Sequence, residues 1–122
     1  MGNVNFAPYL DALDGLVRKA CAHLEGDLDE EQIELYDLAF VKAELLAART
    51  LISQTEQSQQ LVPVCQYFCA NAIVSITQKL AVRQQTFGLT ESELPALDKL
   101  QDFLAPEAIT ALGRQYLDEG LA

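Results

Sequence analysis

The sequence predicts an all-α protein, built as an antiparallel helical bundle of three long helices plus two shorter C-terminal helices. Half of the 122 residues are hydrophobic, which favours a folded core over disorder. Ala, Leu, Glu and Gln, which are good helix formers, dominate the composition. Apolar residues also recur at spacings of three and four. Residues 1–122 are therefore expected to form one helical domain, either whole or as part of a longer protein.

The first helix is predicted from Asn5 to Glu25. Asn5 is suited to cap its N-terminus, and Gly26 is placed to end it in the left-handed conformation. Its buried face is predicted from one apolar stripe at helical spacing. This stripe contains Phe6, Leu10, Leu13, Val17, Ala20 and Leu24.

The second helix is predicted from Glu30 to Ser53, with Asp29 as its N-cap. Two neighbouring apolar stripes run along it. The first contains Ile33, Tyr36, Phe40, Ala43, Ala47 and Leu51, and the second contains Leu38, Val41, Leu45, Ala48 and Ile52. Because this apolar surface is broad, we expect the helix to be central in the bundle. The polar segment 54–60 is predicted to be the loop that follows, the alternative being that its Gln and Glu residues extend the helix.

The third helix is predicted from Pro63 to Phe87, because Pro63 suits a first helical turn and Gly88 suits an end. Its apolar residues again follow helical spacing. At about 1.5 Å per residue, such a helix approaches about 40 Å, which suggests helices that run side by side.

Two shorter helices are predicted in the C-terminal third. Thr90 and Glu93 have the spacing of a capping box, which opens a helix to about Leu104. Pro106 ends this helix and opens the last one, which Gly120 closes. The buried face of the last helix is predicted to contain Ile109, Leu112, Tyr116 and Leu117.

The charge and the cysteines narrow the class of protein. The net charge of -10 argues against nucleic-acid partners, which need clustered Lys and Arg, and against anionic membranes. No apolar run approaches the roughly 18 residues of a membrane span, and no signal peptide is recognised. The three cysteines, an odd number, all lie in predicted helices, which argues against a disulfide framework. We therefore expect a reducing, cytoplasmic environment.

No set of residues has the spacing of a catalytic, cofactor-binding or metal site. His23 is the only histidine. Cys65 and Cys69 share a helical face, but together with His23 they give only three of the four ligands of a structural zinc site. Buried thiols are the favoured interpretation. The acidic run from Glu25 to Asp37 lacks the glycine of a calcium loop and is interpreted as a solvated helix start, the alternative being a docking patch for a basic partner.

Arg49, Lys79 and Arg83 are the candidate partner contacts of a chain that is otherwise short of positive charge. Lys79 and Arg83 are four residues apart in the third predicted helix, so they share one face. Their charge suits a partner carboxylate or a phosphate. The alternative is that they pair with acids on the chain's own surface.

Two stretches resemble a known family. The segment Tyr36–Arg49, which reads YDLAFVKAELLAAR, resembles the start of a helix hairpin in the C-terminal helical domain of acyl-CoA dehydrogenase-like flavoproteins. The segment Ala70–Leu89 resembles the long helix that follows there. The resemblance implies a non-catalytic C-terminal bundle domain that serves interdomain or oligomer contacts. FAD and the catalytic carboxylate would belong to the larger body of the parent flavoprotein, so no catalytic or flavin-binding residue is carried over.

Two other functions stay open. A free-standing helical adaptor, as a monomer or a dimer, is suggested by the broad apolar surface of the second and third helices. Its partner would be a self-associating copy, whereas the domain hypothesis implies the rest of a flavoprotein chain. A small enzyme or ligand-binding bundle would place Cys65, Cys69, Lys79 and Arg83 around a pocket between helices.

Overall fold

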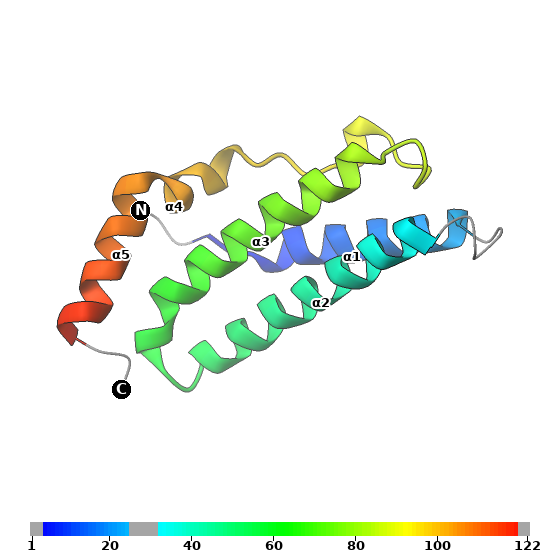
Figure 1. The fold of residues 1–122 in the computed structure, drawn as a ribbon. Helices are drawn as coiled ribbons and strands as arrows, with labels where there is room; N and C mark the ends of the chain where they lie inside the picture. The colour runs from blue at the N-terminus through cyan, green and yellow to red at the C-terminus, as the bar shows by residue number, and fades with distance from the viewer. Residues whose placement is uncertain (1–3, 25–31, 120–122) are drawn as a thin grey trace.

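A computed structural model describes residues 4–24 and 32–119 of the chain (Figure 1). The described residues confirm the all-α prediction, with no strand among them. The three long helices are α1 (Ala7–His23), α2 (Gln32–Thr55) and α3 (Val62–Val82), the last preceded by the 3-10 turn η1 (Gln59–Leu61). Two further 3-10 turns, η2 (Glu91–Glu93) and η3 (Asp98–Leu100), lead to α4 (Gln101–Leu104) and α5 (Pro106–Glu119). The predicted caps Gly26, Asp29 and Gly120 lie outside the described residues.

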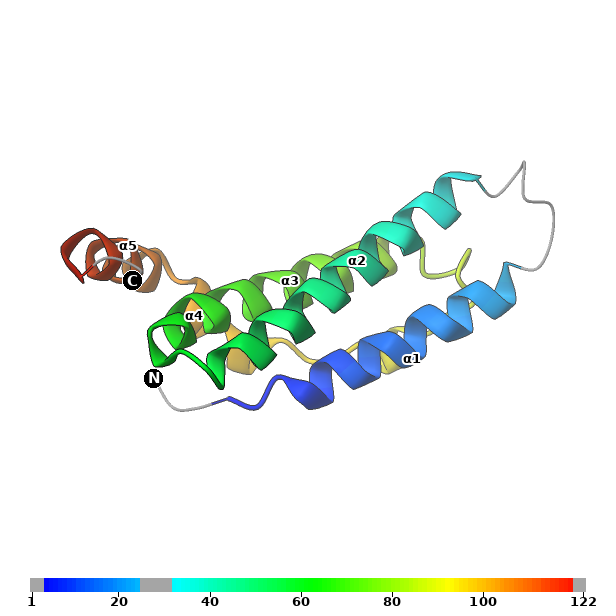
Figure 2. The ribbon, with the colours of Figure 1, turned by 90° about the horizontal axis from the view of Figure 1, so that it is seen from below.

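The long helices run side by side, and consecutive helices are antiparallel (Figures 1 and 2). The helix α3 lies between α2 on one side and the segment that leads to α4 on the other, and α1 packs behind α2 and α3. Of the described helices, α3 supplies the largest set of buried residues: Cys65, Cys69, Ala70, Ala72, Ile73, Ile76, Thr77 and Leu80. The expectation that the second helix would be central is therefore wrong, because α3 holds that position.

The two apolar stripes of α2 have different environments. Leu38, Val41, Leu45 and Ala48, from the second predicted stripe, are buried. Most of the first stripe faces outward, and Ile33, Tyr36 and Phe40 expose 62%, 61% and 62% of their surfaces. This stripe stays uncovered because α1 and α3 both pack on the opposite side of α2 and no described element covers its outer face.

The helix α1 begins at Ala7 with Phe6 rather than Asn5 at its cap position, and the end of α3 also differs from the prediction. Asn5 accepts a hydrogen bond from the backbone N–H of Ala7 through Oδ1, at 3.1 Å. The third helix ends at Val82, five residues before the predicted end, and the chain then turns back through Gly88 at φ 68°. This turn buries Phe87 completely, which explains why the chain leaves the helix early.

The segment after Gly88 is less helical than predicted. The capping box of Thr90 and Glu93 is present, but it opens only the 3-10 turn η2. Pro95 follows, and a residue before proline avoids the helical conformation. Leu94 accordingly is extended, at φ -73° and ψ 140°. The predicted helix from Thr90 to about Leu104 is therefore replaced by two 3-10 turns and the four-residue α4.

The last helix begins at Pro106 as predicted, but its predicted buried face is wrong. No residue of α5 is buried, and Leu117 exposes 86% of its surface. The reason is its position, because α5 projects from one end of the bundle and packs mainly against α4 and α3 (Figure 2).

One helical stretch has the length and composition of a membrane span. Residues Gln59–Val82 contain a window with a mean hydropathy of 1.2. The expectation that no apolar run reaches the length of a membrane span therefore does not hold for this helix by length and composition alone. In the bundle this stretch forms α3, whose apolar side chains build the core, and a core helix of a soluble protein has the same composition.

Candidate functional site

The outer face of α2 carries an uncharged, largely apolar strip that we call the outer ridge. It consists of Ile33, Tyr36, Ala39, Phe40, Ala43, Leu46 and Ala47. Every one of these side chains is exposed, and Leu46 exposes 54% of its surface. Ile33, Tyr36, Phe40, Ala43 and Ala47 are spaced by three and four residues, which places them on one side of the helix.

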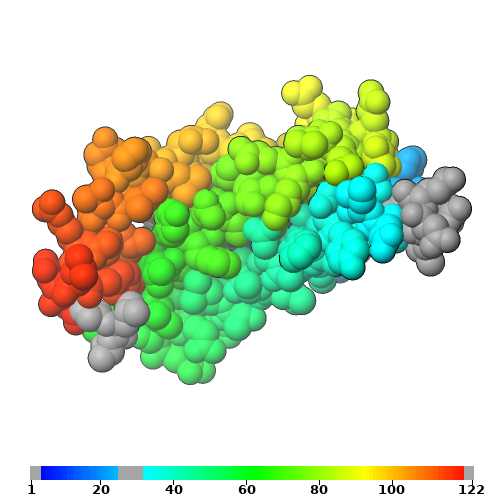
Figure 3. All heavy atoms as spheres, in the orientation of Figure 1, coloured from blue at the N-terminus to red at the C-terminus, as the bar shows by residue number. Residues whose placement is uncertain are grey.

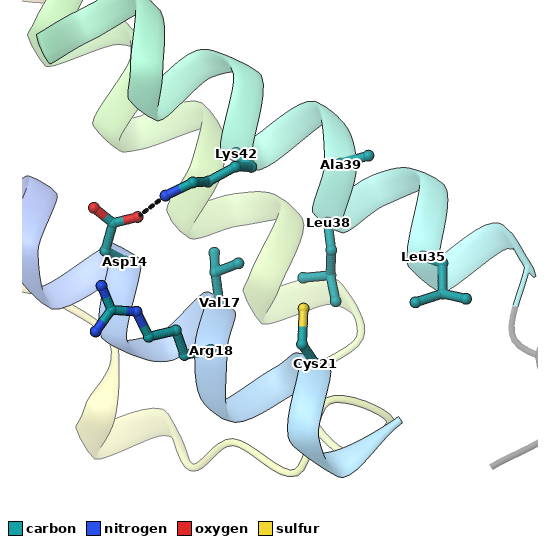
Figure 4. A pocket seen from close by; sticks show the side chains of 8 residues that line it. All are labelled: Asp14, Val17, Arg18, Cys21, Leu35, Leu38, Ala39 and Lys42. Atoms are coloured by element: carbon teal, nitrogen blue, oxygen red, sulfur yellow. Dashed lines mark hydrogen bonds and ion pairs between the residues drawn. The ribbon is translucent and has the colours of Figure 1, made fainter. Parts of the chain in front are cut away.

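A groove lies beside the outer ridge, between α1 and α2 (Figure 4). It has a volume of about 580 Å³. Its wall is mostly apolar, and its lining includes Val17, Cys21, Leu35, Leu38 and Ala39. The thiol of Cys21 points into the space between the two helices. A smaller hollow of about 260 Å³ adjoins it, since both are lined by Leu35 and Ala39.

Ion pairs between α1 and α2 line one edge of the outer ridge. Asp14 accepts from Lys42 at 2.9 Å and from Arg49 at 2.7 Å, and Arg49 also bonds Asp11 at 2.8 Å. The Asp14 side chain is only 12% exposed. Partial burial disfavours the charged carboxylate, but the hydrogen bonds and charges of Arg49 and Lys42 outweigh it, so the pKa of Asp14 lies below its ordinary value.

Ion pairs between α2 and the C-terminal end of α3 line the opposite edge of the outer ridge. Glu44 pairs with Lys79 at 2.5 Å. Arg83 pairs with Asp37 at 2.9 Å and with Glu34 at 3.5 Å. The outer ridge therefore lies between two rows of charges that are largely balanced within the chain. Figure 3 shows that α2 and α3 form one continuous surface on this face.

The candidate contacts Arg49, Lys79 and Arg83 thus border the outer ridge on its two sides, Arg49 toward α1 and the other two toward α3. All three are partly exposed and bonded to carboxylates of the same chain. Exposed pairs of this kind stabilise a fold by only about 0–1 kcal/mol each, so their geometry serves to order the rims of the ridge more than to hold the bundle.

The thiols of Cys65 and Cys69 lie in the core, with their sulfur atoms 3.9 Å apart. Burial, together with the neighbouring Cys65, raises the pKa of Cys69 to about 12. Cys65 lines a cleft of about 220 Å³ whose lining contains neither Lys79 nor Arg83. The structure therefore does not gather these four residues around one pocket. Across residues 4–24 and 32–119, no three His, Cys, Asp or Glu side chains lie close enough together to hold a metal ion.

Comparison of the chain with protein-family models, with curated proteins and with solved structures found no match. The functional interpretation therefore depends on the surface described above. Sequence reasoning missed two features of that surface, the groove and the role of Asp14. The outer ridge itself could have been found from the sequence, because the first apolar stripe of α2 forms a continuous helical face that contains no charged residue.

Proposed function

We propose that this chain is a non-catalytic helical protein-interaction module that docks a partner through the outer ridge of α2. One observation supports this proposal above the others. The ridge presents Ile33, Tyr36, Phe40 and Leu46, each more than half exposed, on a face without a charge of its own. An exposed apolar patch of this size, rimmed by polar groups, is typical of interaction sites.

The chemistry of the two aromatic residues fits this function. Tyr and Phe offer a large apolar area for few rotatable bonds, and Tyr in particular is enriched where interfaces have their strongest contacts. The flanking charges already have partners in the chain, so docking on the ridge does not require an isolated charge to be buried.

A second candidate function follows from the resemblance to acyl-CoA dehydrogenase-like flavoproteins. The segment Tyr36–Arg49 that carries the resemblance contains most of the outer ridge. Under this proposal the ridge contacts the larger body of a flavoprotein, which binds FAD, and the chain is its C-terminal bundle domain. Both proposals place the chain in the cytoplasm, where the thiols of Cys21, Cys65 and Cys69 stay reduced.

Site-specific photo-crosslinking in the source cell tests the docking proposal. A photoreactive phenylalanine analogue at position 40 is compared with the same analogue at Leu117, which is more exposed and lies on α5. We expect a discrete adduct from position 40 only, whose second component is identified by mass spectrometry. Equal labelling from the two positions, or none from position 40, contradicts the proposal.

The mass of the natural gene product separates the two candidates. An antibody raised against this chain is used on extracts of the source cell. A product several times larger than 13.4 kDa that also carries flavin supports the domain of a flavoprotein. A product of about this mass supports the free-standing module.

A further inference from the structure

The outer ridge changes in size along α2, and this gradient identifies its partner. Along the central line of the ridge, where residues are spaced by three and four, large side chains occupy the N-terminal half (Ile33, Tyr36 and Phe40) and small ones the C-terminal half (Ala43 and Ala47). Ala39 and Leu46 lie beside this line, on the flank toward α1. Thr50 continues the small half and is exposed as well. A partner helix must therefore present small residues to the first half and large residues to the second.

We propose that the partner is a second copy of this chain, whose α2 packs antiparallel against the first around a two-fold axis midway between Phe40 and Ala43. This inference rests on the proposed docking function and names its partner. The axis places Phe40 opposite the partner's Ala43 and Tyr36 opposite the partner's Ala47. Ile33 lies opposite the partner's Thr50 at the two ends of the contact. Each large side chain meets a small one, as well-packed helix pairs require.

The same two-fold axis also places an exposed leucine of each copy against the groove of the other copy. A two-fold rotation of antiparallel helices keeps corresponding flanks on the same side of the contact, so Leu46 lies on the flank that carries the partner's Leu35 and Ala39. Along the helix it reaches the level of the partner's residue 37, between these two lining residues of the groove. An exposed leucine and an apolar groove are thus brought together twice by one symmetry operation.

The charges of the interface permit two copies to approach. The whole chain carries a net charge of -10, which opposes self-association over most of its surface. On the outer ridge this repulsion is absent, and along its rims Lys42, Arg49, Lys79 and Arg83 offset most of the neighbouring carboxylates. Lys79 and Arg83 also neutralise Glu44 and Asp37, which the two-fold axis brings near the same acids of the partner.

The available area suits a dimer of moderate affinity. Large aromatic residues bury about 150–250 Å² each, so Tyr36 and Phe40, about three-fifths exposed, offer together about 250 Å² per copy. Each partner in a stable interface contributes about 800 Å². Ile33, Leu46, the alanines and the groove wall supply further area along a contact about 26 Å long, from residue 33 to residue 50. We therefore expect a dimer that dissociates on dilution.

The proposed dimer is tested by sedimentation velocity of the purified 122-residue chain over a concentration series. The test compares variants in which the large and small side chains at positions 40 and 43 are changed. Phe40→Ala leaves a small residue opposite a small one, and Ala43→Phe sets two phenylalanines against each other. Each variant alone is expected to raise the dimer Kd at least tenfold. An equimolar mixture of the two restores Ala opposite Phe at both sites and is expected to recover most of the affinity. The double variant Phe40→Ala/Ala43→Phe recovers it in the same way.

Leu117→Ala is the matched control, since this side chain is exposed and lies on α5. It is expected to leave the Kd unchanged. A dimer that survives both single variants, or a mixture that shows no recovery, overturns the two-fold arrangement. A chain that stays monomeric at every concentration also overturns it. If position 40 then still crosslinks to a different, identified polypeptide, the proposed docking function stands while this inference fails; if it does not, both fail.

Discussion

The imidazole ring of His23, at the end of α1, lies directly against Gly88, in the turn after α3. A Cβ atom on residue 88 would come within 2.6 Å of Nδ1 of His23. Gly88 also has φ 68°, in the left-handed region that side chains with a Cβ rarely adopt. This turn returns the chain over the end of the bundle and buries Phe87 and Leu89 on either side of the glycine.

Gly88→Ala is therefore expected to lower the free energy of unfolding by about 1–2 kcal/mol, because a left-handed conformation costs about that much for an L-residue with a Cβ. The exposed ring of His23 can move aside, so most of the loss comes from the backbone. Urea unfolding followed by circular dichroism measures it. In a His23→Ala background more than half of the loss should remain. A Gly88→Ala protein as stable as the wild type contradicts this account.

Asp14→Asn is expected to destabilise the bundle by about 1–2 kcal/mol at pH 7, because it weakens two charge-assisted hydrogen bonds at a partly buried carboxylate. The pKa of Asp14 is lower in the folded chain than its ordinary value, so its stabilising effect is present above the unfolded pKa of about 3.9. That effect is lost as the pH falls through the folded pKa.

Urea unfolding at pH 7, 5 and 3 checks both the magnitude and the sign of this dependence. The difference in free energy of unfolding between the wild type and Asp14→Asn should be constant from pH 7 to pH 5 and should become smaller at pH 3. Asp118→Asn, on the exposed surface of α5, is the control and should match the wild type. A gap that widens as the pH falls would show that the sign is wrong.

The elements of this fold were predictable to different degrees, for a physical reason. Helical spacing shows which residues share a face of a helix, and Pro and Gly mark where helices begin and end. Spacing does not show whether another element covers that face. Tyr36 and Val41 both belong to apolar stripes of α2, yet Tyr36 is 61% exposed and Val41 is fully buried. Only the positions of α1 and α3 decide between them.

The candidate site shows the same limit. Arg49 could be singled out as one of few bases, but its carboxylate partner Asp14 is 35 residues away in the sequence. Which acid a base finds depends on the register between two helices, and this register follows from packing across the whole core. The groove between α1 and α2 also forms only when the helices meet, so no single segment encodes it.

The three cysteines should differ in reactivity toward alkylating agents. Cys21 is exposed, whereas Cys65 and Cys69 are buried, and burial raises the pKa of both buried thiols. Since the thiolate is the reactive form, we expect one fast adduct at Cys21 under native conditions at pH 8. Mass spectrometry over a time course with iodoacetamide measures it, and the urea-unfolded chain, which should give three adducts, is the control. Three adducts at similar rates in the native protein would contradict the buried positions.

The last prediction concerns α5, which should open far more easily than the bundle. No residue of α5 is buried, whereas α3 contributes eight buried residues to the core. Local opening requires only the free energy of the contacts that it breaks, so the amides of α5 are expected to exchange on the order of 100-fold faster than those of α3. Hydrogen exchange with mass spectrometry measures both helices in one experiment.

A single described side-chain hydrogen bond ties α5 to η1, the turn just before α3, because the hydroxyl of Tyr116 donates to the backbone carbonyl of Gln60. Tyr116→Phe removes this bond and keeps the ring. We expect exchange in α5 to rise severalfold, since a hydrogen bond contributes about 0.5–1.5 kcal/mol, with no change in α3. Leu117→Ala, at an exposed neighbour that makes no such bond, is the matched control. Protection of α5 equal to that of α3 would mean that this helix is held by contacts the structure does not show.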